Sequence, residues 1–269
     1  MKLQQVLNRV CKACEEYQMI EEGDRIAVGV SGGKDSLTLL YALAHMRRFF
    51  PKEFELEAIT VDLGFPGMDF SPVAELCRKL GVNYTVVETR IADIVHTYKK
   101  EENPCSLCAK LRRGSFNEKA QELNCNKTAY AHNLDDVIET MLLSLFYEGR
   151  FSCFLPVTHL DKTGLTLIRP LIYVREADIK GFRNLYRLPV VESTCPAAGR
   201  TKRQYVKELV RTLQAEIPDL KKSLFHAIKT SSIPGWQPAG PIPETRLGGE
   251  ERHKAPNSAR QQRISFENE

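Results

Sequence analysis

A glycine-rich turn near the N-terminus has the residue types of a phosphate-binding loop. It lies between an apolar run and a helix-like apolar pattern, and its residues are Ser31, Gly32, Gly33, Lys34, Asp35 and Ser36. Glycines let the backbone approach phosphate oxygens, and the start of a helix adds partial positive charge. A tight turn without a ligand would give no packing reason for Lys34 and Asp35. The spacing fits neither G-x-x-x-x-G-K-S/T nor G-x-G-x-x-G, so we expect a phosphate site of another kind.

Carboxylates that could act at such a site follow two apolar runs further along the chain. Asp135 and Asp136 begin a helical pattern, and Asp62 ends an earlier run. Ligands of parallel sheets collect at the carboxyl ends of strands, and Mg²⁺ at a phosphate is held by one or two carboxylates. Acids at a helix start also suit the helix dipole without any ligand, so capping is the alternative. We expect the backbone from Thr60 to Asp62 to lie near a nucleotide base, and His132 to be a packing residue.

The cysteines form a second group with possible chemistry. Cys105 and Cys108 stand at C-x-x-C spacing at a predicted helix start, and Cys195 is a third candidate. The pair alone fits zinc, an iron–sulfur cluster, a redox site or two unrelated buried cysteines. Cys11 and Cys14 repeat the spacing inside an amphipathic helical pattern, where we expect core packing. The polar N-terminus and the lack of a long apolar run predict a cytoplasmic protein that does not enter a membrane. Disulfides are rare in the reducing cytoplasm, so we expect these cysteines to be free thiols or ligands.

Basic residues flank the candidate cysteines on both sides. Those that could contact a nucleic acid are Lys110, Arg112, Arg113, Arg200, Lys202 and Arg203. A nucleic-acid backbone would be attracted to such a surface, although solvated helix faces carry similar charge. The net charge of +4 is only mildly basic and does not itself indicate nucleic-acid binding.

The elements that must position these groups alternate along the chain. Apolar runs that predict strands are separated by helical patterns, and the runs cover 25–30, 54–64, 82–89 and 127–131. This alternation predicts an α/β fold, a parallel twisted sheet with helices on both faces. A further run over 165–174 predicts an edge strand because it contains Pro170. We expect an N-terminal helix within 1–24, one domain over 25–230 and a flexible tail over 231–269, which is rich in proline, glycine and charge.

Two motifs carry a resemblance to a known superfamily. The sequence SGGKDS at 31–36 resembles the PP-loop signature of the N-type ATP pyrophosphatases, and AHNLDDVIET at 131–140 resembles a nucleotide-site motif of their tRNA-modifying branch. The run CSLCAKLRRG at 105–114 is similar to the tRNA 2-thiocytidine synthetase family. The resemblance covers about residues 1–230. It implies that ATP adenylates the 2-carbonyl oxygen of a tRNA cytidine, position 32 being favoured, and that sulfur then replaces this oxygen with release of AMP and pyrophosphate.

The resemblance also implies roles for individual residues. Cys105, Cys108 and Cys195 would hold a 4Fe–4S cluster, with one iron left open for the sulfur. Catalysis would involve Lys34, Asp35, Asp135 and Asp136 with Mg²⁺. ATP would contact Ser31, Gly32, Gly33, Lys34, Asp35, Ser36, Thr60, Asp62 and Ala131. The implied partners are tRNA, a sulfur donor (free sulfide, or a cysteine desulfurase or persulfide carrier) and a second copy of the chain in a homodimer.

Three alternatives stay open at this point. Another PP-loop reaction on tRNA could take place, such as 2-thiouridine formation or amidation of a base. A nucleotide-binding iron–sulfur redox sensor would use the same residues without modifying RNA. A zinc-bound structural module is a third possibility, although structural zinc sites take four protein ligands and the sequence offers no clear fourth.

Overall fold

The computed structural model describes residues 1–95, 104–192, 194–195 and 202–238 of the chain. Its centre is a six-stranded sheet with the order β3-β2-β1-β4-β6-β5. The strands are β1 (Asp24–Gly29), β2 (Phe54–Asp62), β3 (Asn83–Glu88), β4 (Lys127–Ala129), β5 (Val157–Leu160) and β6 (Leu165–Ile168). All neighbouring pairs are parallel except β5 with β6. The predicted parallel sheet is thus confirmed, with an antiparallel hairpin at one edge.

Pro170 determines where strand β6 ends, and it does not place β6 at the edge of the sheet as we predicted. We expected the run 165–174 at a sheet edge, but β6 pairs with β4 on one side and β5 on the other. This is possible because β6 ends at Ile168, before Pro170, so the residue without an N–H lies outside the ladder. The chain after β6 is therefore free to turn toward the next helix.

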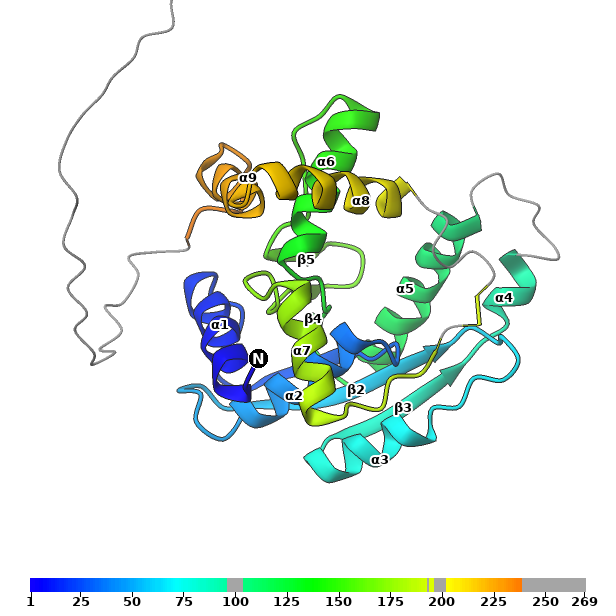
Figure 1. Cartoon of the computed structure of the whole chain (residues 1–269). Coiled ribbons are helices and arrows are strands. Elements are labelled where there is room, and N and C mark those ends of the chain that lie inside the picture. The colour runs from blue at the N-terminus through cyan, green and yellow to red at the C-terminus, as the bar shows by residue number, and fades with distance from the viewer. Residues whose placement is uncertain (96–103, 193, 196–201, 239–269) are drawn as a thin grey trace, which may run out of the picture.

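Nine helices are found in the described part of the chain, and they cover both faces of the sheet (Figure 1). They are α1 (Leu3–Glu16), α2 (Lys34–Met46), α3 (Ser71–Leu80), α4 (Ile91–Asp93), α5 (Pro104–Glu122), α6 (Leu134–Glu148), α7 (Glu176–Tyr186), α8 (Lys202–Glu216) and α9 (Leu220–Thr230). α5 lies on one face, and α2 lies on the other with α1, α3 and α7 beside it. Alternate side chains of β1 point to opposite faces of the sheet. Ala27 packs in one cluster with Phe116 of α5, whereas Ile26 and Val28 belong to the larger core on the α2 side.

The order of the strands determines where a ligand can bind. β1 is central, and the chain builds β2 and β3 on one side of it but β4 and β6 on the other. Segments that follow β1 and β4 therefore leave the sheet in opposite directions and open a crevice between them. This switch point brings the turn 31–36 next to residues 130–136, which are about a hundred positions away in sequence.

The C-terminal part of the described chain is packed against the core. Trp236 has no exposed surface, and its ring meets Tyr17 of α1 and Phe225 of α9 edge-on, at centroid distances of 6.1 and 5.7 Å. The hydroxyl of Tyr17 donates to the carbonyl of Trp236. Residues 231–238, the first part of the predicted tail, are thus folded, because a single large aromatic residue anchors them. The remainder of that tail, 239–269, lies outside the described residues.

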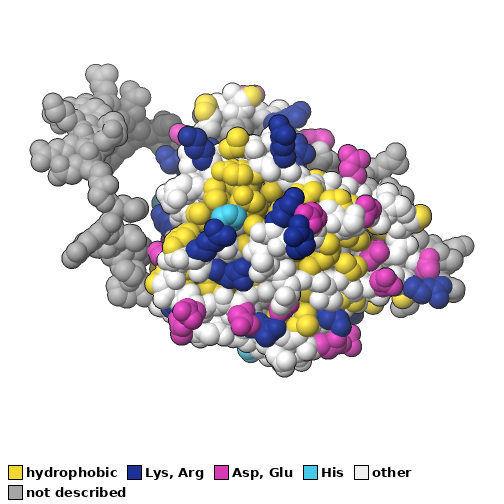
Figure 2. Space-filling model, turned by 90° about the horizontal axis from the view of Figure 1, so that it is seen from below, with side chains coloured by type: hydrophobic (Ala, Val, Ile, Leu, Met, Phe, Trp, Pro, Cys, Tyr) yellow, Lys and Arg dark blue, Asp and Glu magenta, His cyan; other side chains and the backbone are white. Residues whose placement is uncertain are grey.

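The surface combines apolar and basic groups. Figure 2, from below the view of Figure 1, shows a band of hydrophobic side chains among Lys and Arg. Exposed apolar surface of this kind is typical of contact sites, and the homodimer stays a prediction. Over the described ranges, no helix combines the length and hydrophobicity needed to cross a membrane.

Candidate active site

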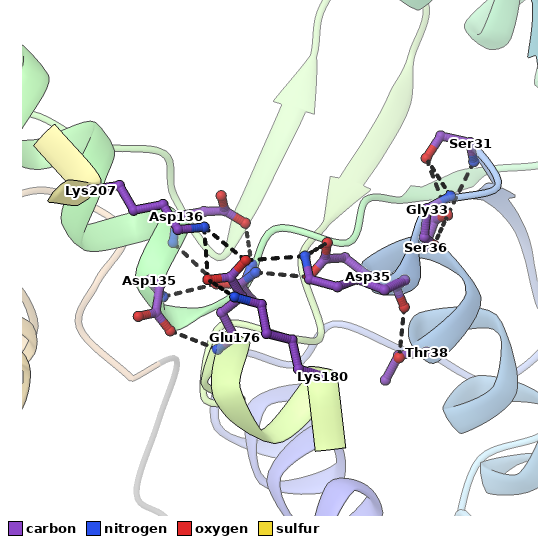
Figure 3. Close-up of polar contacts among 12 residues, drawn as sticks. Ser31, Gly33, Asp35, Ser36, Thr38, Asp135, Asp136, Glu176, Lys180 and Lys207 are labelled. Atoms are coloured by element: carbon purple, nitrogen blue, oxygen red, sulfur yellow. Dashed lines mark hydrogen bonds and ion pairs between the residues drawn. The ribbon is translucent and has the colours of Figure 1, made fainter. Parts of the chain in front are cut away.

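The turn between β1 and α2 is held by hydrogen bonds among its own residues (Figure 3). Ser36 Oγ donates to the carbonyl of Gly33 at 2.9 Å and accepts from the backbone N–H of Ser31 at 3.2 Å. Gly32 has a φ of +80°, and a Cβ there would lie 2.9 Å from Cβ of Val191. The backbone N–H of Val191 donates to the Gly32 carbonyl. Only glycine fits this position without strain.

The start of α2 is available to an anion. Gly33 is the N-cap residue and provides no side-chain acceptor for the first N–H groups of the helix. Such groups carry partial positive charge and bind phosphate well. Lys34 adds a full charge: burial lowers its pKa, but pairing with Asp35 and Glu176 outweighs this and raises it. The turn thus combines the N–H groups of a helix start with the charge of Lys34, and phosphate binding there stays a prediction.

The start of α6 faces this turn, and Asn133 joins the two. Its Oδ1 accepts from the N–H groups of Asp135 and Asp136, and its Nδ2 donates to Asp35 at 3.1 Å. Asp136 in turn accepts from the N–H of Asn133, which completes a capping box. Asp136 therefore takes part in capping α6, and its carboxylate also lines the pocket, so its predicted role at a ligand stays a prediction. Sequence reasoning did not identify Asn133.

Asp135 is already fully engaged in the fold. One carboxylate oxygen accepts from the backbone N–H of Glu176 at 2.7 Å, and the other pairs with Lys221 of α9 at 2.6 Å. Its side chain is only 7% exposed. This carboxylate joins the starts of α6 and α7 to α9, so its contacts in this structure are those of a positioning group. Asp35 and Asp136 are the more open carboxylates of the predicted set.

A pocket of about 230 Å³ lies between the turn and these helices. Its lining residues are Lys34, Asp35, Asn133, Asp135, Asp136, Glu139, Glu176, Arg203, Gln204 and Lys207. The pocket therefore combines the predicted residues of the turn and of α6 with residues of α7 and α8. Charged groups of both signs line it, which is the composition expected around a phosphate and its counter-ion.

Two carboxylates of the pocket were missed by sequence reasoning. Glu176 pairs with Lys34 at 3.2 Å. It also pairs with Lys207 at 2.7 Å (Figure 3). Burial would raise its pKa, but the two lysines lower it to about 2. Burial and the neighbouring Asp136 raise the pKa of Glu139 to about 7, despite Arg203 at 3.4 Å. In the sequence, Glu176 could have been found from its position at a helix start after a strand. Glu139 could have been found only because it lies one helical turn after Asp136.

The residues expected near the base of a nucleotide are tied to the sheet. Thr60 is buried, donates to the carbonyl of Val30 at 2.5 Å and accepts from Tyr84. Asp62 accepts from the N–H of Gly64 in the turn after β2. The side-chain oxygens of Thr60 and Asp62 are thus hydrogen-bonded within the protein. Contact with a base through backbone groups of this segment stays a prediction. Ala131, partly buried, follows β4.

The structure brings the three candidate cysteines together. Cys105 and Cys108 lie on the first turns of α5, and Cys195 is near enough that its charge, like that of Cys105, raises the pKa of Cys108. Burial is the larger cause, and Arg112 opposes it. None of the eight cysteines, all in the described ranges, forms a disulfide. Cys14 is buried and its pKa is well above normal, as expected for core packing.

Three soft thiol ligands fit an iron–sulfur cluster as a donor set. In the described residues, no three Cys, His, Asp or Glu side chains stand in metal-binding geometry, so the three thiols are close but not arranged around an ion. Cys105 is exposed and Cys108 and Cys195 are partly exposed. The group therefore has the chemistry and the access that a cluster requires.

The predicted RNA-binding residues fall into separate environments. Lys110, Arg112 and Arg113 are exposed on α5. Lys202 lies 4.4 Å from the ring centre of Tyr147. Arg203 instead points into the pocket, where it donates to Thr140 and pairs with Glu139 and Asp136. Arg200 lies outside the described residues.

Beside these residues, His132 is stacked on Phe154 at a centroid distance of 4.4 Å. Its Nδ1 accepts from Nε of Arg169 at 3.2 Å. Burial, followed by the charges of Arg169 and other arginines, lowers the pKa of His132 to about 3. The ring is thus neutral near pH 7, and its stacking and its contact with Arg169 are those of a packed side chain.

Known proteins resemble this chain over most of its length. The family model of the PP-loop domain matches residues 2–213. A tRNA-cytidine(32) 2-sulfurtransferase of Geotalea uraniireducens (strain Rf4) is 42% identical over 226 residues, which cover 83% of this chain and 90% of that protein. A protein of the same name from Geobacter sulfurreducens is 39% identical, covering 85% and 90%. The U34-tRNA thiolase NcsA from Methanococcus maripaludis, with its 4Fe–4S cluster, has a TM-score of 0.69 at 26% identity and covers 83% of this chain and 76% of that one.

Proposed function

Because the chain belongs to the PP-loop family, and within it to the tRNA-cytidine 2-sulfurtransferases, we propose that it uses ATP to replace the 2-oxygen of a tRNA cytidine by sulfur. Cytidine 32 is the favoured position, as in the names of the relatives. The observation that carries the proposal is the approach of Cys105 and Cys195 to Cys108 on α5, in a protein whose phosphate turn lies at the same end of the sheet.

The first half of the proposed reaction activates the base. A pyrimidine 2-carbonyl carbon is a poor electrophile, and its oxygen is a poor leaving group. Attack of that oxygen on the α-phosphorus of ATP forms a new P–O bond, breaks the bond to the β-phosphate oxygen and releases pyrophosphate. Lys34 and the N-terminus of α2 would stabilise the charge on the phosphates, an electrostatic contribution that is usually large. The remaining residues 31–36 would surround them.

Mg²⁺ is proposed to bind between the two open carboxylates. Asp35 and Asp136 both line the pocket, and one or two carboxylates with several waters are the usual protein contribution to such a site. Burial raises the pKa of Asp136, so a divalent cation would also stabilise its ionised form. Asp135 would orient this arrangement from behind through Glu176.

The second half of the proposed reaction introduces sulfur. A sulfide sulfur, supplied as free sulfide or released from a persulfide carrier by a two-electron thiol reductant, forms a bond to the activated carbon, and AMP leaves with the original oxygen. A 4Fe–4S cluster, when bound by Cys105, Cys108 and Cys195, would present this sulfur to the base. Arg112 and Arg113, exposed next to Cys108 on α5, would attract the RNA, together with Lys110, Arg200, Lys202 and Arg203.

The experiment that tests the function measures thionucleosides in tRNA from a strain that lacks this protein. We expect 2-thiocytidine to disappear, to return with the wild-type gene and not to return with Cys108→Ser, since a serine oxygen cannot replace a thiolate ligand. Cys14→Ser is the matched control, because Cys14 is buried in the core away from α5. Unchanged 2-thiocytidine in the deletion strain would contradict the proposal.

The redox-sensor alternative makes a different prediction. A sensor would bind the nucleotide without consuming it, whereas the proposed enzyme forms AMP and pyrophosphate only when tRNA is added.

The proposal also includes a cytoplasmic location and a homodimer. It divides the chain into residues 1–24, residues 25–230 and a terminal segment.

A further inference from the structure

One buried arginine has no acidic partner among the described residues. Arg169 follows β6 and is only 7% exposed. Its guanidinium donates to the carbonyl of Leu155 at 2.5 Å, to Thr158 Oγ1 at 3.0 Å and to His132 Nδ1 at 3.2 Å, and it lies 5.2 Å from the ring centre of Phe154. All of these partners are neutral. A buried charge normally has a counter-ion, because its desolvation is otherwise costly.

The contacts of Arg169 fix its orientation. Nε and Nη1 of Arg169 donate hydrogen bonds within the protein. Nη2 contacts no acceptor in the described residues, and the protein does not enclose this atom. His132 stacks on Phe154 and accepts a hydrogen bond from this guanidinium. One edge of the guanidinium is therefore anchored, and the other remains available to a ligand.

Two more arginines approach the same place from α5. The helix packs Phe116 against Tyr130, just before His132, at a centroid distance of 5.4 Å. Arg112 and Arg113 precede Phe116 by four and three positions, so all three lie on one side of the helix. The charges of both arginines act on Tyr130 and on His132. Among the described residues, neither arginine pairs with an Asp or Glu.

The same side of α5 leads back to the sulfur site. Cys108 precedes Arg112 by four residues, and the charge of Arg112 lowers the pKa of this thiol. In the other direction, His132 is followed by Asn133, the cap of α6 at the nucleotide pocket. The positive charge of these arginines thus lies between the candidate cysteines and the pocket. In the proposed reaction the RNA base must be placed there, because it reacts first with ATP and then with the sulfur.

We propose that Arg112, Arg113 and Arg169 form a binding site for one phosphate group of the RNA substrate, beside the base to be modified. This inference rests on the proposed function, which it extends by assigning Arg169 of the β6 end to the substrate. A phosphodiester matches the charge and the planar donor geometry of guanidinium groups. Unpaired loop nucleotides are the form in which RNA bases are usually presented to proteins. The α-phosphate of ATP is the other source of the same chemical group.

The test compares RNA and ATP binding by the full chain with its metal centre assembled under anaerobic conditions. Arg112→Gln, Arg169→Lys and Arg169→Gln are the variants. The RNA probe is a hairpin with the sequence of a tRNA anticodon stem and loop, and the second probe is ATP alone. We expect the RNA dissociation constant to rise about tenfold, as for loss of a hydrogen bond to a charged group, and that for ATP to stay unchanged.

The salt dependence separates a phosphate contact from a loss of structure. The slope of log Kd against log salt should fall by about 0.7 to 1 for Arg112→Gln, because one phosphate contact is removed. Arg112 is exposed, so this variant should fold normally even if Arg169→Gln does not. Arg78→Gln is the control, since Arg78 is exposed on α3 and pairs with Glu75.

Three results would overturn the inference. If only ATP binding weakens, the phosphate belongs to the nucleotide. If RNA affinity falls with an unchanged salt slope in Arg112→Gln, no phosphate contact was lost. If neither ligand is affected, the arginines hold no phosphate. Failure of the wild-type protein to bind RNA at all would instead contradict the proposed function.

Discussion

At the scale of single residues, the pocket depends on side chains with two duties. Asp136 caps α6 and also offers a carboxylate to the pocket, and Asn133 caps the same helix while it contacts Asp35. Gly32 combines a left-handed backbone conformation with close packing against Val191. A residue with two duties tolerates little change, because a substitution that preserves one duty disturbs the other.

Gly32→Ala is expected to destabilise the phosphate turn. The added Cβ would lie 2.9 Å from Cβ of Val191, at a φ of +80°. We expect the free energy of unfolding to fall by about 1 to 3 kcal/mol, as measured by urea denaturation. Gly33→Ala is the matched control, since Gly33 has a φ of −75° and its Cβ would meet only Ser31 Oγ, at 3.4 Å. Equal destabilisation by both variants would show that the conformation of Gly32 is not what matters.

At the scale of elements, the contact between α6 and α8 shapes one wall of the pocket. Arg203 of α8 donates to Thr140 at 3.0 Å and pairs with Glu139 at 3.4 Å, and both partners are on α6. α8 follows the segment that contains Cys195, so it connects the nucleotide pocket with the cysteine site. The sequence predicted Arg203 as an RNA-contacting residue but not that it turns inward, because the sequence alone does not say which neighbour its side chain meets.

The buried carboxylate of Glu139 should make stability depend on pH. Burial raises its pKa to about 7 from a usual 4.5, so the folded state binds a proton that the unfolded state has lost between these values. Stability should therefore fall as the pH rises from about 4.5 to 7, by as much as about 3 kcal/mol. Glu139→Gln should lose this decline. Chemical denaturation of both proteins across that range checks it, and parallel curves would contradict it.

At the scale of the whole molecule, the fold class and the phosphate turn could be predicted because they rest on local patterns. The alternation of strands and helices gave the parallel sheet, and the turn 31–36 has its glycines and lysine in one short run. Glu176, Arg169 and Trp236 could not be predicted in this way. Each acts through contacts with residues distant in sequence; for Glu176 the sequence shows its place at a helix start but not its two lysine partners.

Trp236 provides a test at this scale. A chain that ends at Thr230 should be less stable than one that ends at Pro238, by about 3 to 5 kcal/mol, since it loses a fully buried aromatic side chain. Trp236→Ala in the full chain should have a similar effect. Because residues 239–269 are rich in proline, glycine and charge, their removal alone should leave stability unchanged. Thermal and urea unfolding of the full chain, the two shortened chains and Trp236→Ala measure this, and a large loss on ending at Pro238 would refute the last expectation.

The distribution of the pocket along the chain has a consequence for biosynthesis. Lys34 lies near the start of the chain, whereas Arg203 and Lys207 are contributed by α8, close to its described end. A ribosome releases these parts in order, and domains fold as their residues emerge. The nascent protein thus exposes a phosphate turn whose opposite wall has not yet been synthesised. The pocket is completed only after all three cysteines have been translated, so a nascent chain that ends before Cys195 has the phosphate turn without the wall that α8 provides.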